Sequence, residues 1–184
     1  MAIYQYHFTL IPRQSIIDKF GNIPTQLFID LETRKTNKKK VNLENNFDEE
    51  LIKHWWKAQK ILFEKFESFI DSFAKEIEWT KKFSNCKSYG DEDSNDFAIF
   101  LDKEGYIEEF TGRVDLRKLD IFFITNLLAL AKQMHCLILD TNGNLFEPFI
   151  DNLNEQIKLS SAFKFVEDPR GFLHAFSNRR IKPE

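Results

Sequence analysis

The first residues of the chain alternate between hydrophobic and polar side chains. In residues 3–11, "IYQYHFTLI", the even positions are aromatic or aliphatic and most odd positions are polar. The even set is Tyr4, Tyr6, Phe8 and Leu10, and the polar odd positions are Gln5, His7 and Thr9. Successive side chains of a strand point to opposite faces, so this period of two predicts a strand with one buried face, ending at Pro12.

The same period returns between residues 106 and 117, "YIEEFTGRVDLR". Its hydrophobic even positions are Tyr106, Phe110, Val114 and Leu116, and its polar odd positions include Thr111, Arg113, Asp115 and Arg117. The preceding segment 97–102, "FAIFLD", is apolar on both faces, as in a covered strand. The turn "KEG" between the two segments predicts a β-hairpin.

Hydrophobic residues recur every three or four positions in three further segments, which predicts three helices. Residues 47–79 predict one long amphipathic helix with Asp48 as its N-cap. Residues 118–134 are apolar almost all round, as in a helix buried between layers. Residues 151–167 predict a third helix that ends before Pro169, followed by a packed aromatic turn.

The order of these elements predicts the fold class. A strand, a long helix, a hairpin, a helix and the strand 136–140 are followed by a hairpin partner within 145–149 and the last helix. This order favours an α+β fold, a ferredoxin-like βαββαβ-type sandwich with helices on one face of a largely antiparallel sheet. We expect a single domain over residues 1–184, with an irregular insertion at 13–47 and a basic tail at 177–184.

Composition narrows the class of protein but not its function. The net charge of -3 gives no global attraction to nucleic acid or to an anionic membrane. The longest charge-free stretch in the hydrophobic second half, residues 121–131, is far shorter than the ~20 residues that span a bilayer. The first residues lack the basic segment of a signal peptide, and the two cysteines have no metal spacing. We therefore expect a soluble, cytoplasmic protein with reduced cysteines, and the A/T-rich codon usage implied by its residues suggests a bacterial source.

The charged row in "RVDLR" is the first candidate for a site. If the first strand lies beside it, the row Thr111, Arg113, Asp115 and Arg117 joins Gln5, His7 and Thr9 in one polar patch opposite the helices. The patch has a structural explanation, either as cross-strand ion pairs on a wet sheet face or as a network buried under residues 13–47. It also has two functional explanations, binding of a partner and catalysis.

A catalytic site would need a specific arrangement of these residues. His7 would act as general acid or base, oriented by Asp115, while Arg113 or Arg117 would hold a phosphate or carboxylate substrate. Such a site would suit a small hydrolase or transferase. The chain contains no recognisable nucleophile motif, which weighs against this alternative.

Other sites of chemistry lack support in the sequence. Residues 91–102 match a calcium loop at four ligand positions, but Asp96 replaces the glycine of the sharp turn and residues 97–101 are predicted to be a strand. The histidines are dispersed and no glycine-rich phosphate motif occurs, so we expect neither metal nor cofactor. The basic clusters at 38–40 and 179–182 are short, and the polar sheet face lacks the aromatic residues of an RNA-binding sheet.

These observations favour a non-enzymatic domain that binds another protein, in the manner of a small bacterial immunity or accessory protein. The acidic loop "GDEDSND", residues 90–96, suits a basic partner, since complementary charge steers association. The predicted binding residues are His7, Thr111, Arg113, Asp115 and Arg117, with Asp91 and Asp93 of the loop. A third alternative is a structural subunit of a homo-oligomer, joined through edge strands or the Trp55 and Trp56 region. The sequence leaves monomer and homodimer open.

Overall fold

The computed structural model describes residues 3–27 and 55–177 of the chain, with side chains described as far as residue 174. Its centre is a six-stranded antiparallel sheet in the order β2-β3-β4-β1-β5-β6. The strands are β1 (Gln5–Pro12), β2 (Cys86–Gly90), β3 (Asp96–Leu101), β4 (Ile107–Asp115), β5 (Cys136–Asp140) and β6 (Leu145–Phe146). The predicted α+β class is confirmed.

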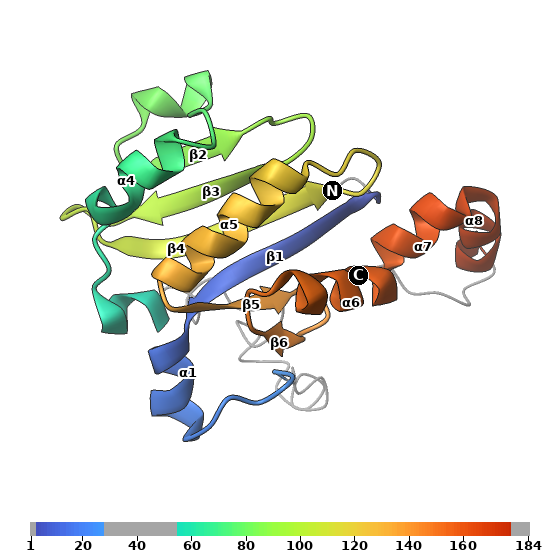
Figure 1. Cartoon of the computed structure of the whole chain (residues 1–184), viewed down its shortest axis with the longest axis horizontal. Coiled ribbons are helices and arrows are strands. Elements are labelled where there is room, and N and C mark those ends of the chain that lie inside the picture. Colours follow the sequence, from blue (N-terminus) through green and yellow to red (C-terminus); the bar gives the residue numbers. More distant parts are fainter. Residues whose placement is uncertain (1–2, 28–54, 178–184) are drawn as a thin grey trace, which may run out of the picture.

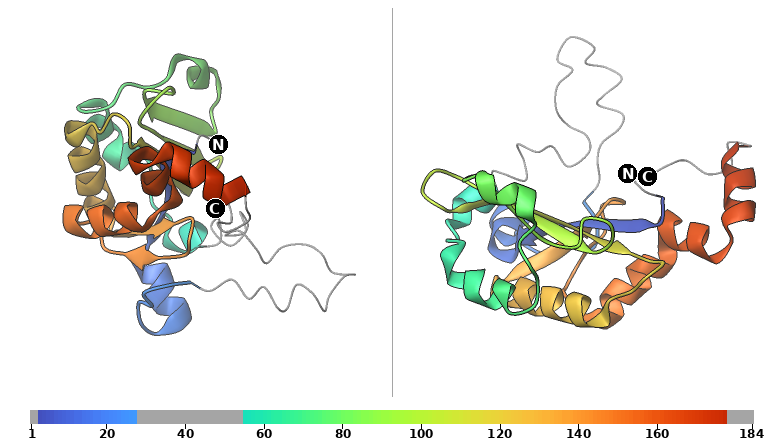
Figure 2. Two further views of the ribbon diagram at one scale, coloured as in Figure 1. Left: turned by 90° about the vertical axis from the view of Figure 1, so that its right-hand side faces the viewer. Right: turned by 90° about the horizontal axis from the view of Figure 1, so that it is seen from above.

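Most helices lie on one face of this sheet. The helices are α1 (Arg13–Phe20), α4 (Glu64–Asp71), the 3-10 helix η1 (Glu78–Lys82), α5 (Ile121–Gln133), α6 (Ile150–Leu159), α7 (Ser161–Glu167) and α8 (Pro169–Ser177). Helix α5 crosses the centre of the sheet (Figure 1), and α4, α5 and α6 share one side of it when the molecule is seen from above (Figure 2). We call this side of the sheet the helix face and the other side the open face.

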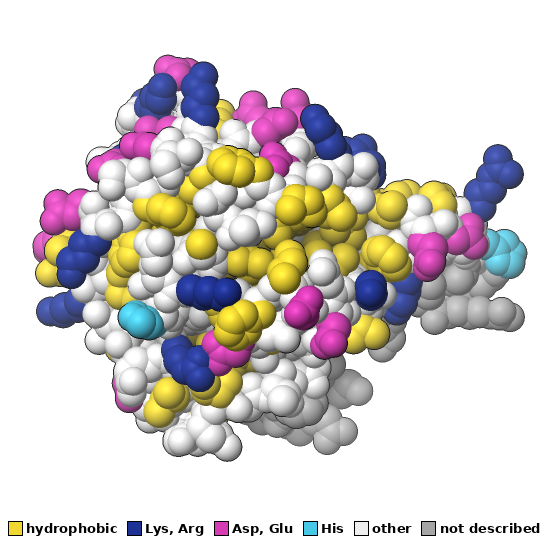
Figure 3. Space-filling model, viewed as in Figure 1, with side chains coloured by type: hydrophobic (Ala, Val, Ile, Leu, Met, Phe, Trp, Pro, Cys, Tyr) yellow, Lys and Arg dark blue, Asp and Glu magenta, His cyan; other side chains and the backbone are white. Residues whose placement is uncertain are grey.

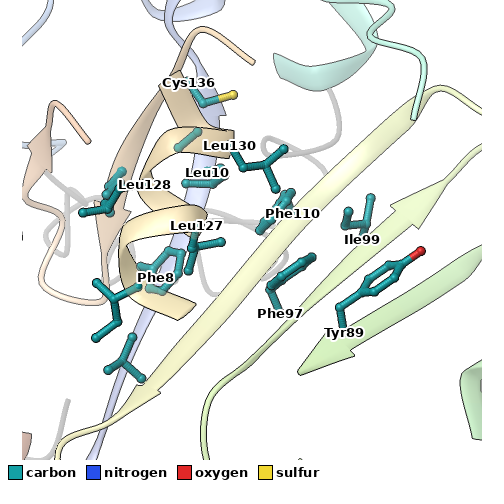
Figure 4. Close-up of a cluster of buried hydrophobic side chains, with 14 of the residues drawn as sticks. Phe8, Leu10, Tyr89, Phe97, Ile99, Phe110, Leu127, Leu128, Leu130 and Cys136 are labelled. Carbon is teal, nitrogen blue, oxygen red and sulfur yellow. The ribbon is translucent and has the colours of Figure 1, made fainter. Parts of the chain in front are cut away.

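The main hydrophobic core fills the space between the helix face and these helices. Phe97 stacks on Phe110 with ring centroids 5.0 Å apart, and Tyr89 stacks on Phe97 at 5.5 Å (Figure 4). The predicted hydrophobic face of β1 belongs to this core, because Tyr6, Phe8 and Leu10 are buried in it. The abundant phenylalanines thus build the core where the periodicity places them.

A second, smaller hydrophobic cluster covers one half of the open face. It consists of Ile11, Ile16, Trp55, Leu137, Leu139 and Leu145. Side chains one position apart on a strand point to opposite faces, so Ile11 lies opposite Leu10 of the main core. Helix α1, at the start of the predicted irregular insertion, supplies Ile16 to this cluster and ends at Phe20, where Gly21 is the C-cap with a positive φ of 74°.

The single long helix predicted at 47–79 is interrupted within the described residues, where 55–59 and Glu64–Asp71 are helical but the chain between and after them is not. Helix α4 covers only Glu64–Asp71, and Lys60 before it has a positive φ of 46°. The intervening chain pairs with the β3–β4 turn, since Ile107 donates its backbone N–H to Ile61 and Phe63 donates to Gly105. Tertiary pairing has overridden a regular helical period. Residues 47–54 of the prediction lie outside the described residues.

Two strand predictions also need correction. No strand was predicted between residues 79 and 97, yet Cys86–Gly90 forms edge strand β2 with Tyr89 as its only buried hydrophobic residue. The register of β3 and β4 shifts beside Leu101, which turns Ile107 from the predicted polar face into the main core. A bulge of this kind adds a residue to one strand and reverses the parity beyond it.

The helices of the second half depart from the pattern at their ends. Helix α5 was expected to be buried all round, yet Ile121 and Phe122 in its first turn are 61% and 63% exposed. The predicted third helix is two helices, because the hydroxyl of Ser160 caps α7 by accepting the N–H of Phe163. The expected aromatic turn after it is helix α8.

Short segments of chain cover both edges of the sheet. At the β2 edge, Ile77 donates its N–H to the carbonyl of Ser88, and at the β6 edge Leu27 donates to Gly143. Such cover removes free hydrogen-bonding groups that would otherwise pair with another chain. Residues 28–47 of the predicted insertion, with its basic cluster at 38–40, and residues 178–184 of the predicted tail lie outside the described residues.

Candidate functional site

The two polar strands lie side by side, as the sequence suggests. In the register of β1 and β4, His7 pairs with Arg113, Thr9 with Thr111, and Gln5 with Asp115. Strand β3 adds Asp96, which pairs with Arg113 from the other side. Arg113 is therefore the centre of a row across three strands of the open face.

The guanidinium of Arg113 donates its hydrogen bonds to acceptors within the protein. Its Nε and Nη2 atoms donate to the two carboxylate oxygens of Asp96 at 2.8 and 2.7 Å, a bidentate pair. Nη2 also donates to the backbone carbonyl of Glu92, and Nη1 reaches Oε1 of Gln5 at 3.4 Å. Burial raises the pKa of Asp96, although the hydrogen bonds from Arg113 oppose this shift. The guanidinium thus holds strand β3 and the start of its preceding loop against β4.

Asp115 and Arg117 form a separate, local pair. The Asp115 carboxylate is 2% exposed and accepts the Nη2 and Nε atoms of Arg117 at 2.6 and 3.0 Å. The hydrogen bonds from Arg117 lower the pKa of Asp115. The guanidinium of Arg117 also lies 3.3 Å from the ring centroid of Tyr4, a cation–π contact. This pair fixes the chain where it leaves β4.

The end of β4 and the residues that follow it also bind the acidic loop between β2 and β3. The side-chain carbonyl of Asn95, which is 5% exposed, accepts the backbone N–H of Asp115 at 2.9 Å, and its amide donates to the carbonyl of Lys118 at 3.3 Å. Within the loop, Asp91 accepts the N–H of Asp93 at 3.0 Å. Gly90 precedes it with a φ of 110°, and a Cβ there would lie 2.3 Å from the carbonyl oxygen of Asn95. The loop is therefore an ordered structure with its exposed carboxylates pointing to solvent.

Large hydrophobic side chains are exposed at the same end of the molecule. Leu119, Ile121 and Phe122 are 51%, 61% and 63% exposed beside the anchored loop. Trp79, 52% exposed, donates its indole N–H to the Glu92 carboxylate at 2.8 Å. Acidic side chains gather at the upper edge of the molecule above hydrophobic side chains over the start of α5 (Figure 3). We call Asp91–Asp93, Trp79 and Leu119–Phe122 the acidic–apolar surface.

His7 does not take part in the arrangement that catalysis would require. Its Nε2 atom is buried without a hydrogen-bond partner, and no hydrogen bond joins the imidazole to Asp115. Burial, followed by the nearby Arg113 charge, lowers the pKa of His7, so the ring is neutral at pH 7. His7 and Arg113 lie side by side on paired strands, but the carboxylate of Asp115 forms its ion pair with Arg117.

The described residues give no support to a metal site. Within 3–27 and 55–177, no group of three or more histidine, cysteine or acidic side chains could hold an ion. Residues 96–101 of the calcium-loop match form strand β3. Both cysteines are unpaired, and burial raises the pKa of the Cys136 thiol. No helix in the described part of the chain is long and apolar enough to cross a bilayer.

The sequence analysis missed several residues at the end of the molecule that carries the acidic–apolar surface. Asp96 was considered as a failed calcium ligand and as the last residue of the acidic loop, although its place at the start of a strand beside Arg113 signals an ion pair. Asn95 gave no signal, because its two bonds join segments 20 or more positions apart. Phe122 was assigned to a buried helix. A search of protein-family models, curated proteins and solved structures finds no match to this chain.

Proposed function

We propose that the protein is a non-enzymatic binding domain that docks a protein partner on its acidic–apolar surface. The partner presents basic side chains around an apolar pocket or patch. The observation that supports this most directly is the anchoring of the loop. Arg113, Asn95 and the backbone of Asp115 hold exposed carboxylates in a fixed position beside exposed hydrophobic side chains.

The chemistry of the surface favours a protein over a small molecule. Aromatic side chains dominate the binding energy of protein interfaces when they fill a pocket on the partner, and Phe122 and Trp79 are available for this role. The carboxylates of Asp91, Glu92 and Asp93 complement a basic surface and speed association. An ordered loop loses less conformational entropy on binding than a disordered one, which favours affinity.

The bonding of the charged row weighs against the catalytic alternative. Arg113 would have to leave Asp96 to hold an anionic substrate, and Asp115 would have to leave Arg117 to orient His7. The predicted residues Arg113, Asp115 and Arg117 therefore serve the proposed function indirectly, as supports of the loop, while Asp91 and Asp93 contact the partner. An immunity or accessory role remains our proposal for the biological setting.

The oligomer alternative has less to support it than the binding domain. Chain segments cover both sheet edges, and Trp55 and Trp56 are 9% and 0% exposed. Neither feature offers surface to a second copy. We also propose that β3, β4, β1 and β5 form a ferredoxin-like unit, to which β2 and β6 are added at the edges. The antiparallel order of these four strands supports that assignment.

Site-specific photo-crosslinking tests the docking surface. A benzophenone amino acid replaces Phe122 in one variant and Phe20 in a control, since both are exposed phenylalanines and Phe20 lies at the end of α1. The proteins are expressed in the cells of origin, and crosslinked proteins are identified by mass spectrometry. We expect a discrete product from position 122 only. Equal products from both positions, or none from position 122, contradict the proposal.

The purified partner then permits a quantitative test. The variant Glu92→Gln/Asp93→Asn removes two exposed carboxylates from the loop, and Asp151→Asn/Glu155→Gln removes two from α6 as a matched control. We expect the loop variant to bind at least about tenfold more weakly at low salt, with a smaller loss at high salt because exposed charges are screened. Equal affinity of the loop and control variants contradicts the proposed surface.

A further inference from the structure

A pocket lies on the open face, where Arg113 and Asp96, which hold the acidic loop, line one side of it. Its volume is about 200 Å³, and its floor is formed by neighbouring strands. Two rows of side chains cross this floor. Asp96, Arg113 and His7 form one row, and Ala98, Thr111, Thr9 and Leu139 form the next. No helix in the described part of the chain covers this pocket, because most of its lining side chains belong to the face opposite α5.

Three polar groups of residues that line the pocket have no hydrogen-bond partner within 3–27 and 55–177. The Nε2 atom of His7 is buried and unpaired. The hydroxyls of Thr9 and Thr111 are half-buried and make no hydrogen bond within the described part of the chain. A buried polar atom without a partner costs about 1–3 kcal/mol relative to a satisfied one. A native structure that keeps such a group beside a cavity is therefore poised to bind a ligand that satisfies it.

The charged groups around the pocket are already satisfied. Arg113 and Asp96 neutralise each other through two hydrogen bonds. Asp140 also lines the pocket, and its carboxylate accepts the backbone N–H groups of Asn142 and Asn144 at 2.9 and 2.8 Å. The carboxylates of Asp96 and Asp140 would repel an anionic ligand, and the single positive charge of Arg113 does not compensate for both of them. The unpaired groups are instead neutral, and a hydroxyl can both donate and accept a hydrogen bond.

We propose that this pocket binds a small, neutral, polyhydroxyl compound such as a polyol or a single sugar ring. Hydroxyls of the ligand bond to Thr9, Thr111 and the His7 imidazole, while Ala98 provides an apolar contact for its carbon face. The cavity is smaller than the 300–1,000 Å³ typical of drug-sized ligands, so it holds one small ring. This inference is independent of the proposed protein docking, which uses a different surface.

Nuclear magnetic resonance of the full ¹⁵N-labelled chain tests the inference. D-ribose, myo-inositol and inorganic phosphate are titrated separately at pH 7. We expect one of the two polyhydroxyl probes to cause saturable shifts of the backbone amides at residues 7–9 and 111–113, and to shift the Nε2 resonance of His7. Saturation by phosphate alone overturns the proposed ligand class, and no saturable shift with either polyhydroxyl probe overturns the site.

Matched variants connect the shifts to the pocket. Thr9→Val/Thr111→Val removes both hydroxyls with little change in shape, and Thr125→Val makes the same change at an exposed position of α5. We expect binding to weaken at least tenfold in the pocket variant and to remain unchanged in the control. The dispersed amide spectrum shows that each variant is folded, and the single Thr111→Val variant serves if the double variant is not. Unchanged binding by a folded pocket variant overturns the inference.

Discussion

The two halves of the open face are stabilised in different ways. Under α1, the apolar half buries Ile11, Leu137 and Leu139 completely or almost completely. The polar half relies on the Arg113–Asp96 pair and on hydrogen bonds from β4 to the acidic loop. Hydrophobic burial is strong and not directional, whereas the fork of an arginine fixes position. The comparison indicates that the apolar half supports the fold and that the polar half orients a loop.

The largest expected effect lies in the apolar half. The substitution Leu139→Ala removes a side chain that is 1% exposed, and we expect a loss of about 2–5 kcal/mol in the free energy of unfolding. Urea denaturation measures this loss. A loss of unfolding free energy smaller than that caused by a substitution in the polar half would contradict this comparison.

The next effect concerns the central arginine. The substitution Arg113→Met keeps the aliphatic stem but leaves the 17% exposed Asp96 carboxylate without its partner, so we expect a loss of about 1–3 kcal/mol. In the double variant Asp96→Asn/Arg113→Met, part of this loss should return because the unpaired charge is gone. Denaturation of the two variants at pH 7 provides the measurement. No recovery in the double variant would show that packing, not charge, stabilises this row.

A smaller effect depends on pH through His7. Because the pKa of His7 is lowered in the folded protein, the folded state binds fewer protons than the unfolded chain. The corresponding stability is present above the unfolded pKa of about 6.5 and is lost as the pH falls through the folded pKa. Urea denaturation between pH 7.5 and 5 should show this loss in the native protein. The variant His7→Gln should lack that part of the slope, and an identical slope would exclude His7 as its source.

The smallest effect on stability is expected at the proposed docking surface. Phe122 is 63% exposed, so Phe122→Ala should change the free energy of unfolding by no more than about 0.5 kcal/mol. The same substitution should weaken binding of the crosslinked partner at least tenfold, because exposed aromatic anchors contribute little to folding and much to binding. Calorimetry on the purified partner separates the two quantities. A large loss of stability with intact binding would reassign Phe122 to the core.

Periodicity predicted the parts of the fold that depend on local pattern. The faces of β1 and the distal half of β4 follow from alternation, and the adjacency of these strands brings His7 beside Arg113 as expected. Long-range pairing explains what failed. The helix predicted at 47–79 breaks where Ile61 and Phe63 pair with the β3–β4 turn, and β2 is a strand because β3 and residues 75–77 pair with it.

The role of the charged row could be predicted only in part. The alternation of polar and hydrophobic positions predicted that Arg113, Asp115 and Arg117 lie on the face opposite the helices, but it could not assign their hydrogen-bond partners. Arg113 bonds to Asp96 and to the Glu92 carbonyl, which lie 17 and 21 positions away in the sequence. The register of β3 against β4 decides these contacts. That register includes a bulge beside Leu101, which the pattern of a single sequence does not reveal.

Hydrogen exchange of the acidic loop tests the central claim most directly. The claim is that "RVDLR" orders this loop through Arg113. The N–H of Ser94 donates to the carbonyl of Asp91 at 2.9 Å, and the N–H of Asp91 donates to Asn95. We predict that Arg113→Met accelerates exchange at Asp91 and Ser94 at least tenfold while the amides of β1 and β5 keep their protection. Unchanged exchange in the loop, or equal acceleration throughout the sheet, would contradict the claim.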